Sequence, residues 1–269
     1  MNRAASIGRS FSPAKSFLEQ VGDMMILTAR TLVSAVKPPY PYGEEFIGQF
    51  LFALQLCWFP LLISTVAFGF GAPGLQAANI LNLFGALDRL GGFFVLASIR
   101  EFAPFVTAVV VAGVAGTAIT ADLGARKIRE ELDALQVLGV DPIKNLVVPR
   151  FLALMLITGL LDIYALVFGI SGGILTEMVY SQPLGGFFAT LFSNASITDL
   201  WGSVIKCTLF GAIIAVVCCY KGMTASGGAA GVGRTVNQAV VISFMGVFAF
   251  NYVFTQTLLA THPDILNIK

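Results

Sequence analysis

Long apolar runs, separated by short polar segments, dominate the pattern of this sequence. A helix needs about 20 apolar residues to cross the hydrocarbon core of a bilayer. Five runs of about that length, which we interpret as membrane spans, occupy residues 46–70, 95–121, 147–175, 200–220 and 236–260. The pattern therefore predicts an all-α integral membrane protein whose membrane domain covers residues 46–269.

The region before the first span, residues 1–45, follows a different pattern. Its apolar residues recur at helical spacing, and most charged residues fall on other faces; the apolar positions are Phe17, Leu18, Val21, Met24, Met25, Leu32 and Val36. Ser12-Pro13 is typical of a helix start, and the prolines from Pro38 onward are typical of a helix end. We expect an amphipathic helix in the membrane interface, the alternative being a soluble helix docked on another subunit.

Positive charges predict the orientation, because lysine and arginine favour the cytoplasmic side of a membrane. They gather before the first span, between spans two and three, and between spans four and five; the first group is Arg3, Arg9, Lys15, Arg30 and Lys37. This bias predicts a multi-pass protein of the plasma or inner membrane, with a cytoplasmic N-terminus and a C-terminus outside. The first long apolar run starts too far along the chain to be a cleavable signal peptide.

Composition excludes several classes of function. Hydrophobic residues make up 57% of the 269 residues and charged residues only 12%, about half the charged share of a soluble domain. The net charge of +1 gives no basic field for nucleic acid. The four cysteines lie in apolar runs, and the chain has one histidine, so we expect no metal site, no cofactor and no catalytic cluster.

The segment from Arg126 to Leu138 carries the clearest signal outside the spans. Its apolar residues line one helical face and are Ile128, Leu132, Leu135 and Leu138. Gly139 is placed as a helix stop, and Asp141-Pro142 starts the next helix. We interpret the segment as a short charged helix that docks a cytoplasmic partner, the alternative being a solvated connector. The candidate contact residues are Arg126, Arg129, Glu130, Glu131 and Asp133.

Arg100, Glu101 and Asp162 are among the ionisable residues at or inside the spans, where an unpaired charge is costly. Arg100 and Glu101 precede Pro104, and we expect them either to line the mouth of a cavity or to form a local pair. Asp162 falls in the middle of the third span. It is either a polar element of a translocation path or an interhelical hydrogen bond with a serine, threonine or tyrosine.

The glycine-rich segment at residues 228–235, GAAGVGRT, resembles a phosphate-binding loop but lacks its features. Such a loop needs a lysine and must follow a strand, whereas this segment has Arg234 and follows an apolar span. We expect a cytoplasmic turn between spans four and five. The sequence thus predicts that any ATP hydrolysis would be performed by another polypeptide.

Several motifs together resemble the MlaE/YrbE permease family. The most specific is ADLGARKIREELDALQVLGVDPIKNLVVPRFLA at residues 121–153, supported by REFAP at residues 100–104 and CYKGMTASGGAAGVGRTVNQAVV at residues 219–241. The resemblance extends over essentially the whole chain and is closest to the actinobacterial YrbE branch, A-type half. Val114 stands where many family members carry an arginine, so this chain lacks that charge.

The resemblance implies the permease subunit of an ABC-type lipid transporter that works with Mce-domain lipid-binding proteins. Residues 126–138 would be the coupling helix for a separate ATPase subunit, and the chain itself would not be an enzyme. A second YrbE-type permease would pair with it as a heterodimer, through small residues such as Ala112, Gly113 and Gly116. Fatty acids, mycolic-acid-like lipids or sterols would be the cargo.

A self-sufficient secondary transporter of a hydrophobic substrate is the alternative function. That class usually shows internal repeats and polar, broken helices at the membrane midplane. No repeat is evident between the halves of this sequence, and only Asp162 is a midplane candidate.

Overall fold

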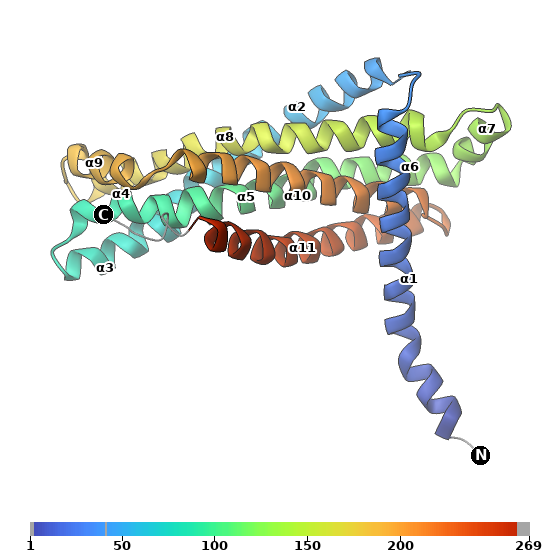
Figure 1. Cartoon of the computed structure of the whole chain (residues 1–269), viewed down its shortest axis with the longest axis horizontal. Helices are drawn as coiled ribbons and strands as arrows, with labels where there is room; N and C mark the ends of the chain where they lie inside the picture. The colour runs from blue at the N-terminus through green and yellow to red at the C-terminus, as the bar shows by residue number, and fades with distance from the viewer. Residues whose placement is uncertain (1–2, 41, 263–269) are drawn as a thin grey trace.

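The protein is a bundle of long helices with a further helix lying across one end (Figure 1). The computed structural model describes the backbone of residues 3–40 and 42–262. Within these ranges every element is helical. The expectation of an all-α fold is therefore confirmed.

Five helical segments in the described part of the chain are long and apolar enough to cross a membrane. They are Gly43–Leu83, Leu87–Ile128, Ile143–Val179, Ile197–Met223 and Gly228–Thr261. The number agrees with the sequence prediction, but the first two segments are much longer than the apolar runs. Helices therefore continue through polar positions at which the hydrophobic pattern had suggested an end.

The first three spans are composite. The first comprises α2 (Gly43–Gly69), η1 (Phe70–Gln76) and α3 (Ala77–Leu83); the second comprises η2 (Leu87–Arg89), α4 (Leu90–Phe94), η3 (Val95–Phe102), α5 (Ala103–Val111), η4 (Ala112–Gly116) and α6 (Thr117–Ile128); the third comprises η5 (Ile143–Val147) and α8 (Val148–Val179). The segments η1, η3, η4 and η5 are π-helical turns. Such wide turns are frequent at functional sites and let a helix accommodate a proline such as Pro73.

The other elements define the two ends of the bundle. The fourth span is α10 (Ile197–Met223), the fifth is α11 (Gly228–Thr261), and two short helices are α7 (Glu131–Val137) and α9 (Leu184–Asn194). α7 lies at one end of the bundle, which we call the α7 end, and α3, α4 and α9 lie at the opposite α9 end (Figure 1). α11 begins at Gly228, so residues 228–235 form its first turns and the predicted glycine-rich turn is wrong.

The crossing helix α1 (Arg3–Val36) packs on the α7 end of the bundle (Figure 1). It starts well before Ser12, so the predicted start is wrong, and it ends just before the prolines as expected. Met24, Leu27 and Thr31 are buried against the bundle. A separate row remains exposed and apolar, and includes Leu18, Val21, Met25, Leu32 and Val36. This exposed row is the face that an interfacial helix would turn toward lipid.

Glycines bring the first and third spans into close contact. A Cβ on Gly69 would stand 2.4 Å from the carbonyl oxygen of Gly169, and a Cβ on Gly172 would stand 2.4 Å from the amide nitrogen of Phe70. No side chain fits at those distances, so the two backbones meet directly. The small residues of the third span therefore serve packing inside this chain.

Candidate functional site

The predicted coupling helix at residues 126–138 is divided into two pieces. Its first residues continue α6, which ends at Ile128, and α7 starts at Glu131. Glu130, between them, has a left-handed backbone with φ of 60°. The prediction of one continuous helix is therefore wrong, because the chain turns sharply at a position whose conformation a straight helix cannot contain.

Ion pairs within the segment stabilise this turn. Arg129 Nε lies 2.7 Å from Glu131 Oε1, and Lys127 Nζ lies 3.0 Å from Asp133 Oδ1. Arg126 pairs with Asp122 of the preceding turn at 3.1 Å. Four of the candidate contact residues thus have partners inside the segment or one helical turn away.

The apolar stripe of the same segment is divided as well. Leu132 is buried and Leu135 is half-buried, whereas Val137 and Leu138 are exposed at the tip of α7. The helix ends as predicted at Gly139, whose amide bonds to Gln136 while the amide of the next residue bonds to the Leu135 carbonyl. The exposed surface is therefore an apolar tip flanked by charges, which is a suitable shape for insertion into a partner.

Asp141 starts the next helix, and a buried arginine follows. Asp141 Oδ1 accepts a hydrogen bond from the amide of Ile143 at 2.9 Å, as the cap-plus-proline pattern predicted. About two turns further along the helix, the side chain of Arg150 is only 1% exposed. Its Nη2 lies 2.8 Å from Asp122 Oδ2 and 3.3 Å from Glu45 Oε1. Sequence reasoning missed this cluster, although an arginine inside an apolar run was its visible signal.

A second polar cluster lies inside the bundle, between the second, fourth and fifth spans. Arg100 Nε donates to Asp199 Oδ1 at 2.7 Å, and the Asp199 side chain is 1% exposed. Asp199 also closes a capping box with Ser196 at the start of α10. Arg100 is therefore bound to the fourth span, and of the two alternatives considered for it the local pair with Glu101 is not the arrangement found.

Glu101 is held by the two other spans of this cluster. Its Oε1 accepts from Thr255 at 2.8 Å and lies 3.4 Å from Lys206 Nζ, while its Oε2 accepts from Asn251 at 2.8 Å. Lys206, which is 3% exposed, also donates to the carbonyl of Arg100. The helix of the second span continues past these charged residues because partners on neighbouring spans compensate their burial.

Asp162 lies one span away from this cluster and is fully buried. Its Oδ2 accepts a hydrogen bond from Ser203 at 2.7 Å, which is the interhelical contact expected as one of its two roles. Its Oδ1 has no hydrogen-bond partner. The carboxyl group therefore links α8 to α10 through one of its two oxygens.

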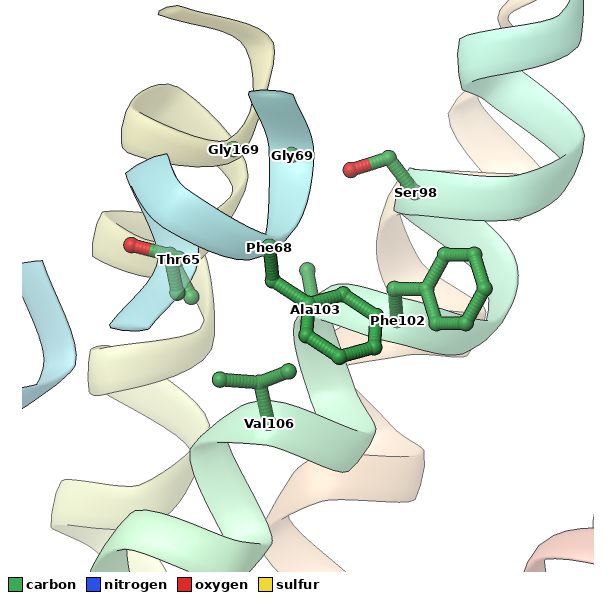
Figure 2. Close-up of a pocket in the computed structure, with 9 residues that line it drawn as sticks. Thr65, Phe68, Gly69, Ser98, Phe102, Ala103, Val106 and Gly169 are labelled. Atoms are coloured by element: carbon green, nitrogen blue, oxygen red, sulfur yellow. The ribbon is translucent and has the colours of Figure 1, made fainter. Parts of the chain in front are cut away.

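A small cavity of about 10 Å³ opens on the other face of η3, between α2, α5 and α8. Figure 2 shows Phe68, Phe102 and Val106 around it, with Thr65 and Ser98 as its polar side chains. The π-helical turn η3 thus lines this cavity on one side and carries the charged residues Arg100 and Glu101, each held by other spans, on the other. The described residues contain no cluster of three or more potential metal ligands.

Two of the small residues expected to pack between permease copies lie inside this chain. Ala112 is fully buried, and a Cβ on Gly116 would stand 2.9 Å from Cys218 Sγ of α10. Both are therefore occupied by contacts within this chain. Gly113 is exposed, with nothing near the position of a Cβ, and remains open to a second copy.

Comparison with known proteins places this arrangement in a family. The family described as Permease MlaE matches residues 46–257. A probable ABC transporter permease protein of Rickettsia typhi is 31% identical over 244 residues, covering 90% of this chain and 93% of the relative. A probable ABC transporter permease protein of Synechocystis is 39% identical over 183 residues, covering 66% of this chain and 68% of the relative.

A plant protein is also similar. The chloroplast protein TRIGALACTOSYLDIACYLGLYCEROL 1 of Arabidopsis thaliana is 37% identical over 182 residues, covering 67% of this chain and 52% of the relative. The family match, the probable ABC permeases and the five apolar helices agree with one another. The chain is a multi-pass membrane protein that belongs to the MlaE permease family of ABC transporters.

Proposed function

We propose that this chain is the membrane subunit of an ATP-driven lipid transporter. An ABC permease requires an ATP-hydrolysing engine, and the only glycine-rich segment resembling a nucleotide loop is here the helical start of α11. Hydrolysis is therefore assigned to a separate ATPase subunit. The chain acts as a conduit and does not catalyse a reaction itself.

The exposed tip of α7 is the observation that carries the proposal. Val137 and Leu138 project as an exposed apolar pair beside the charged turn at Glu130. Exposing apolar side chains to water at a projecting tip is unfavourable, and insertion into a cleft of an ATPase subunit would bury them. In the cell we assign the α7 end, together with the N-terminus, to the cytoplasm, and the α9 end and the C-terminus to the outside.

A connected path leads from this tip into the bundle. α7 follows α6, whose Asp122 holds both Arg126 and the buried Arg150. Arg150 in turn reaches Glu45 at the start of the first span. A movement of α7 would therefore be transmitted to three spans at once. ATP-driven switching of a transport cavity needs such a connection.

Lipid is the proposed cargo. The name of the Arabidopsis relative includes the name of a galactolipid. Phenylalanine side chains line the cavity beside η3. The charged cluster of Arg100, Glu101 and Lys206 would meet a polar headgroup, while the apolar face of the same turn would meet acyl chains. A second YrbE-type permease, forming a heterodimer, and Mce-domain proteins on the outer side would complete the assembly.

Co-purification tests the proposal. The complex is extracted in detergent from cells producing wild type, Leu138→Asp or the control Ile197→Asp, which changes an equally exposed apolar residue at the start of α10. Bound subunits are identified by mass spectrometry, and ATPase activity is assayed. We expect wild type and control to carry an ATPase, a second permease and Mce proteins, and Leu138→Asp to lose the ATPase.

Two results would contradict the proposal. If Leu138→Asp retains the ATPase as well as the control does, α7 is not the docking element. If wild type purifies without any ATPase, and reconstituted vesicles move lipid under an ion gradient alone, the chain is a secondary transporter instead.

A further inference from the structure

A polar cavity of about 330 Å³ lies at the α7 end, between α1, the last turn of α10 and the first turns of α11. This volume falls in the range of roughly 300–1,000 Å³ that is usual for small-molecule sites. Of the nine described residues that line it, eight have polar side chains, the exception being Gly231, and none of the nine is a carboxylate. Lys221 and Arg234 are its two cations.

Lys221 is buried and pairs with no carboxylate among the residues that the structure describes. It is 6% exposed, and its Nζ donates to Gln20 Oε1 at 2.8 Å and to Gln238 Oε1 at 3.1 Å. An ammonium group has three N–H donors, so one remains for a ligand. Neutral amide oxygens orient the ammonium but do not neutralise it, and a buried charge is costly until a counter-charge is present.

Arg234 is the second cation and lies across the cavity wall on α11. Its Nη2 stands 3.1 Å from the position of a Cβ on Gly227, so the guanidinium lies over the turn between α10 and α11. No carboxylate pairs with it among the residues that the structure describes. Asp23 accepts a hydrogen bond from Tyr220 at 3.2 Å but does not line the cavity. The cavity thus combines these two cations with the hydroxyl of Ser226, whereas the hydroxyls of Thr224 and Thr235 donate to backbone carbonyls.

The cavity also lies where a membrane boundary is expected. Lys221 is in the last turn of the fourth span, and Arg234 is near the start of the fifth. α1, which closes the cavity with Gln20, exposes the apolar side chains of Leu18 and Val21 next to that residue. A molecule with an anionic head and apolar tails would satisfy both surfaces at once.

We propose that this cavity binds the phosphate group of an anionic phospholipid from the surrounding membrane, at a site separate from the transport path. The guanidinium of Arg234 and the ammonium of Lys221 contact the phosphate oxygens, and the hydroxyl of Ser226 donates to a remaining one. The bound lipid links α1 to the turn between the fourth and fifth spans. The inference does not depend on the cargo or the ATPase assigned above.

Binding is measured on the full-length chain in neutral detergent, by thermal unfolding and native mass spectrometry. The added probes are phosphatidylglycerol, zwitterionic phosphatidylcholine and inorganic phosphate. The variants are Arg234→Gln, the double variant Lys221→Gln with Arg234→Gln, and a control, Lys15→Gln with Arg30→Gln, which removes the same charge from α1. Lys15 and Arg30 are exposed and do not line the cavity.

We expect phosphatidylglycerol to raise the unfolding temperature of wild type and control equally, and by more than phosphatidylcholine does. We also expect more phosphatidylglycerol than phosphatidylcholine to remain bound in the mass spectrum. The single variant should bind phosphatidylglycerol about tenfold more weakly than wild type, and the double variant more weakly still. Added salt should weaken the binding of phosphatidylglycerol to wild type. Because Arg234 is exposed, its variant tests the site even if loss of Lys221 prevents folding.

Three outcomes would overturn the proposal. Equal affinity of wild type and Arg234→Gln for phosphatidylglycerol would show that the cavity is not the site. Equal loss in the control would show only general attraction to positive charge. Stabilisation by inorganic phosphate but not by the lipid would assign the cavity to a soluble phosphate compound instead.

Discussion

Arg150 Nη2 lies 2.8 Å from Asp122 Oδ2, and this ion pair joins the third span to the second where α6 leads into α7. Glu45 of the first span approaches the same guanidinium at 3.3 Å. Arg150 is buried, whereas both carboxylates are partly exposed. The arginine therefore depends on its partners more than they depend on it.

Replacing Asp122 with alanine should destabilise the fold strongly. The buried guanidinium would keep Glu45, at the longer distance, as its carboxylate partner, together with its hydrogen bond to the Leu146 carbonyl, and we expect a loss of about 2–4 kcal/mol. Asp133→Ala is the control, because its exposed pair with Lys127 should be worth less than about 1 kcal/mol. Reversible unfolding in mixed micelles with a denaturing detergent measures both. Equal losses would show that Arg150 does not need Asp122.

The close contact of the first and third spans predicts a contrast between two neighbouring glycines. Gly69→Ala places a Cβ 2.4 Å from the Gly169 carbonyl oxygen, and should cost about 1–3 kcal/mol as the helices are forced apart. Gly71→Ala meets nothing within 4 Å and should be close to neutral. The same unfolding assay compares them, and similar stabilities would refute the close approach.

The turn between α6 and α7 predicts that Glu130→Gly tightens this segment. Glutamate at a φ of 60° bears a cost of roughly 1–2 kcal/mol that glycine avoids. We expect slower hydrogen exchange of the α7 amides in Glu130→Gly and faster exchange in Glu130→Val. An unchanged exchange rate in both variants would mean that the turn is not left-handed in the membrane.

The polar cluster inside the bundle predicts an asymmetry between Glu101→Ala and Lys206→Met. Without Glu101, the buried Lys206 loses its carboxylate partner, which should cost about 3–5 kcal/mol. Without Lys206, Glu101 retains Asn251 and Thr255, and a methionine fills the space, so the cost should stay below about 2 kcal/mol. Thermal unfolding of the purified chain ranks them, and the reverse order would refute this account.

The sequence by itself determined the membrane class, the number of spans, the helix stop at Gly139 and the cap at Asp141. Partition into a bilayer depends on each residue's own transfer free energy, so an apolar run reports a span without knowledge of its neighbours. The stop at Gly139 and the cap at Asp141 are equally local, because each satisfies backbone groups a few residues away.

Only the tertiary structure decided how the charges are arranged. Arg100 pairs with a residue 99 positions away, and Asp122 with one 28 positions away. No spacing rule reveals such partners, and for that reason the alternatives considered for Arg100 and Glu101 did not include Asp199. The spans extend beyond their apolar runs for the same reason. A charged residue whose partner lies on a neighbouring helix does not end the helix that carries it. Helical periodicity likewise could not reveal the turn at Glu130, because its left-handed backbone interrupts the stripe that the residue types suggest.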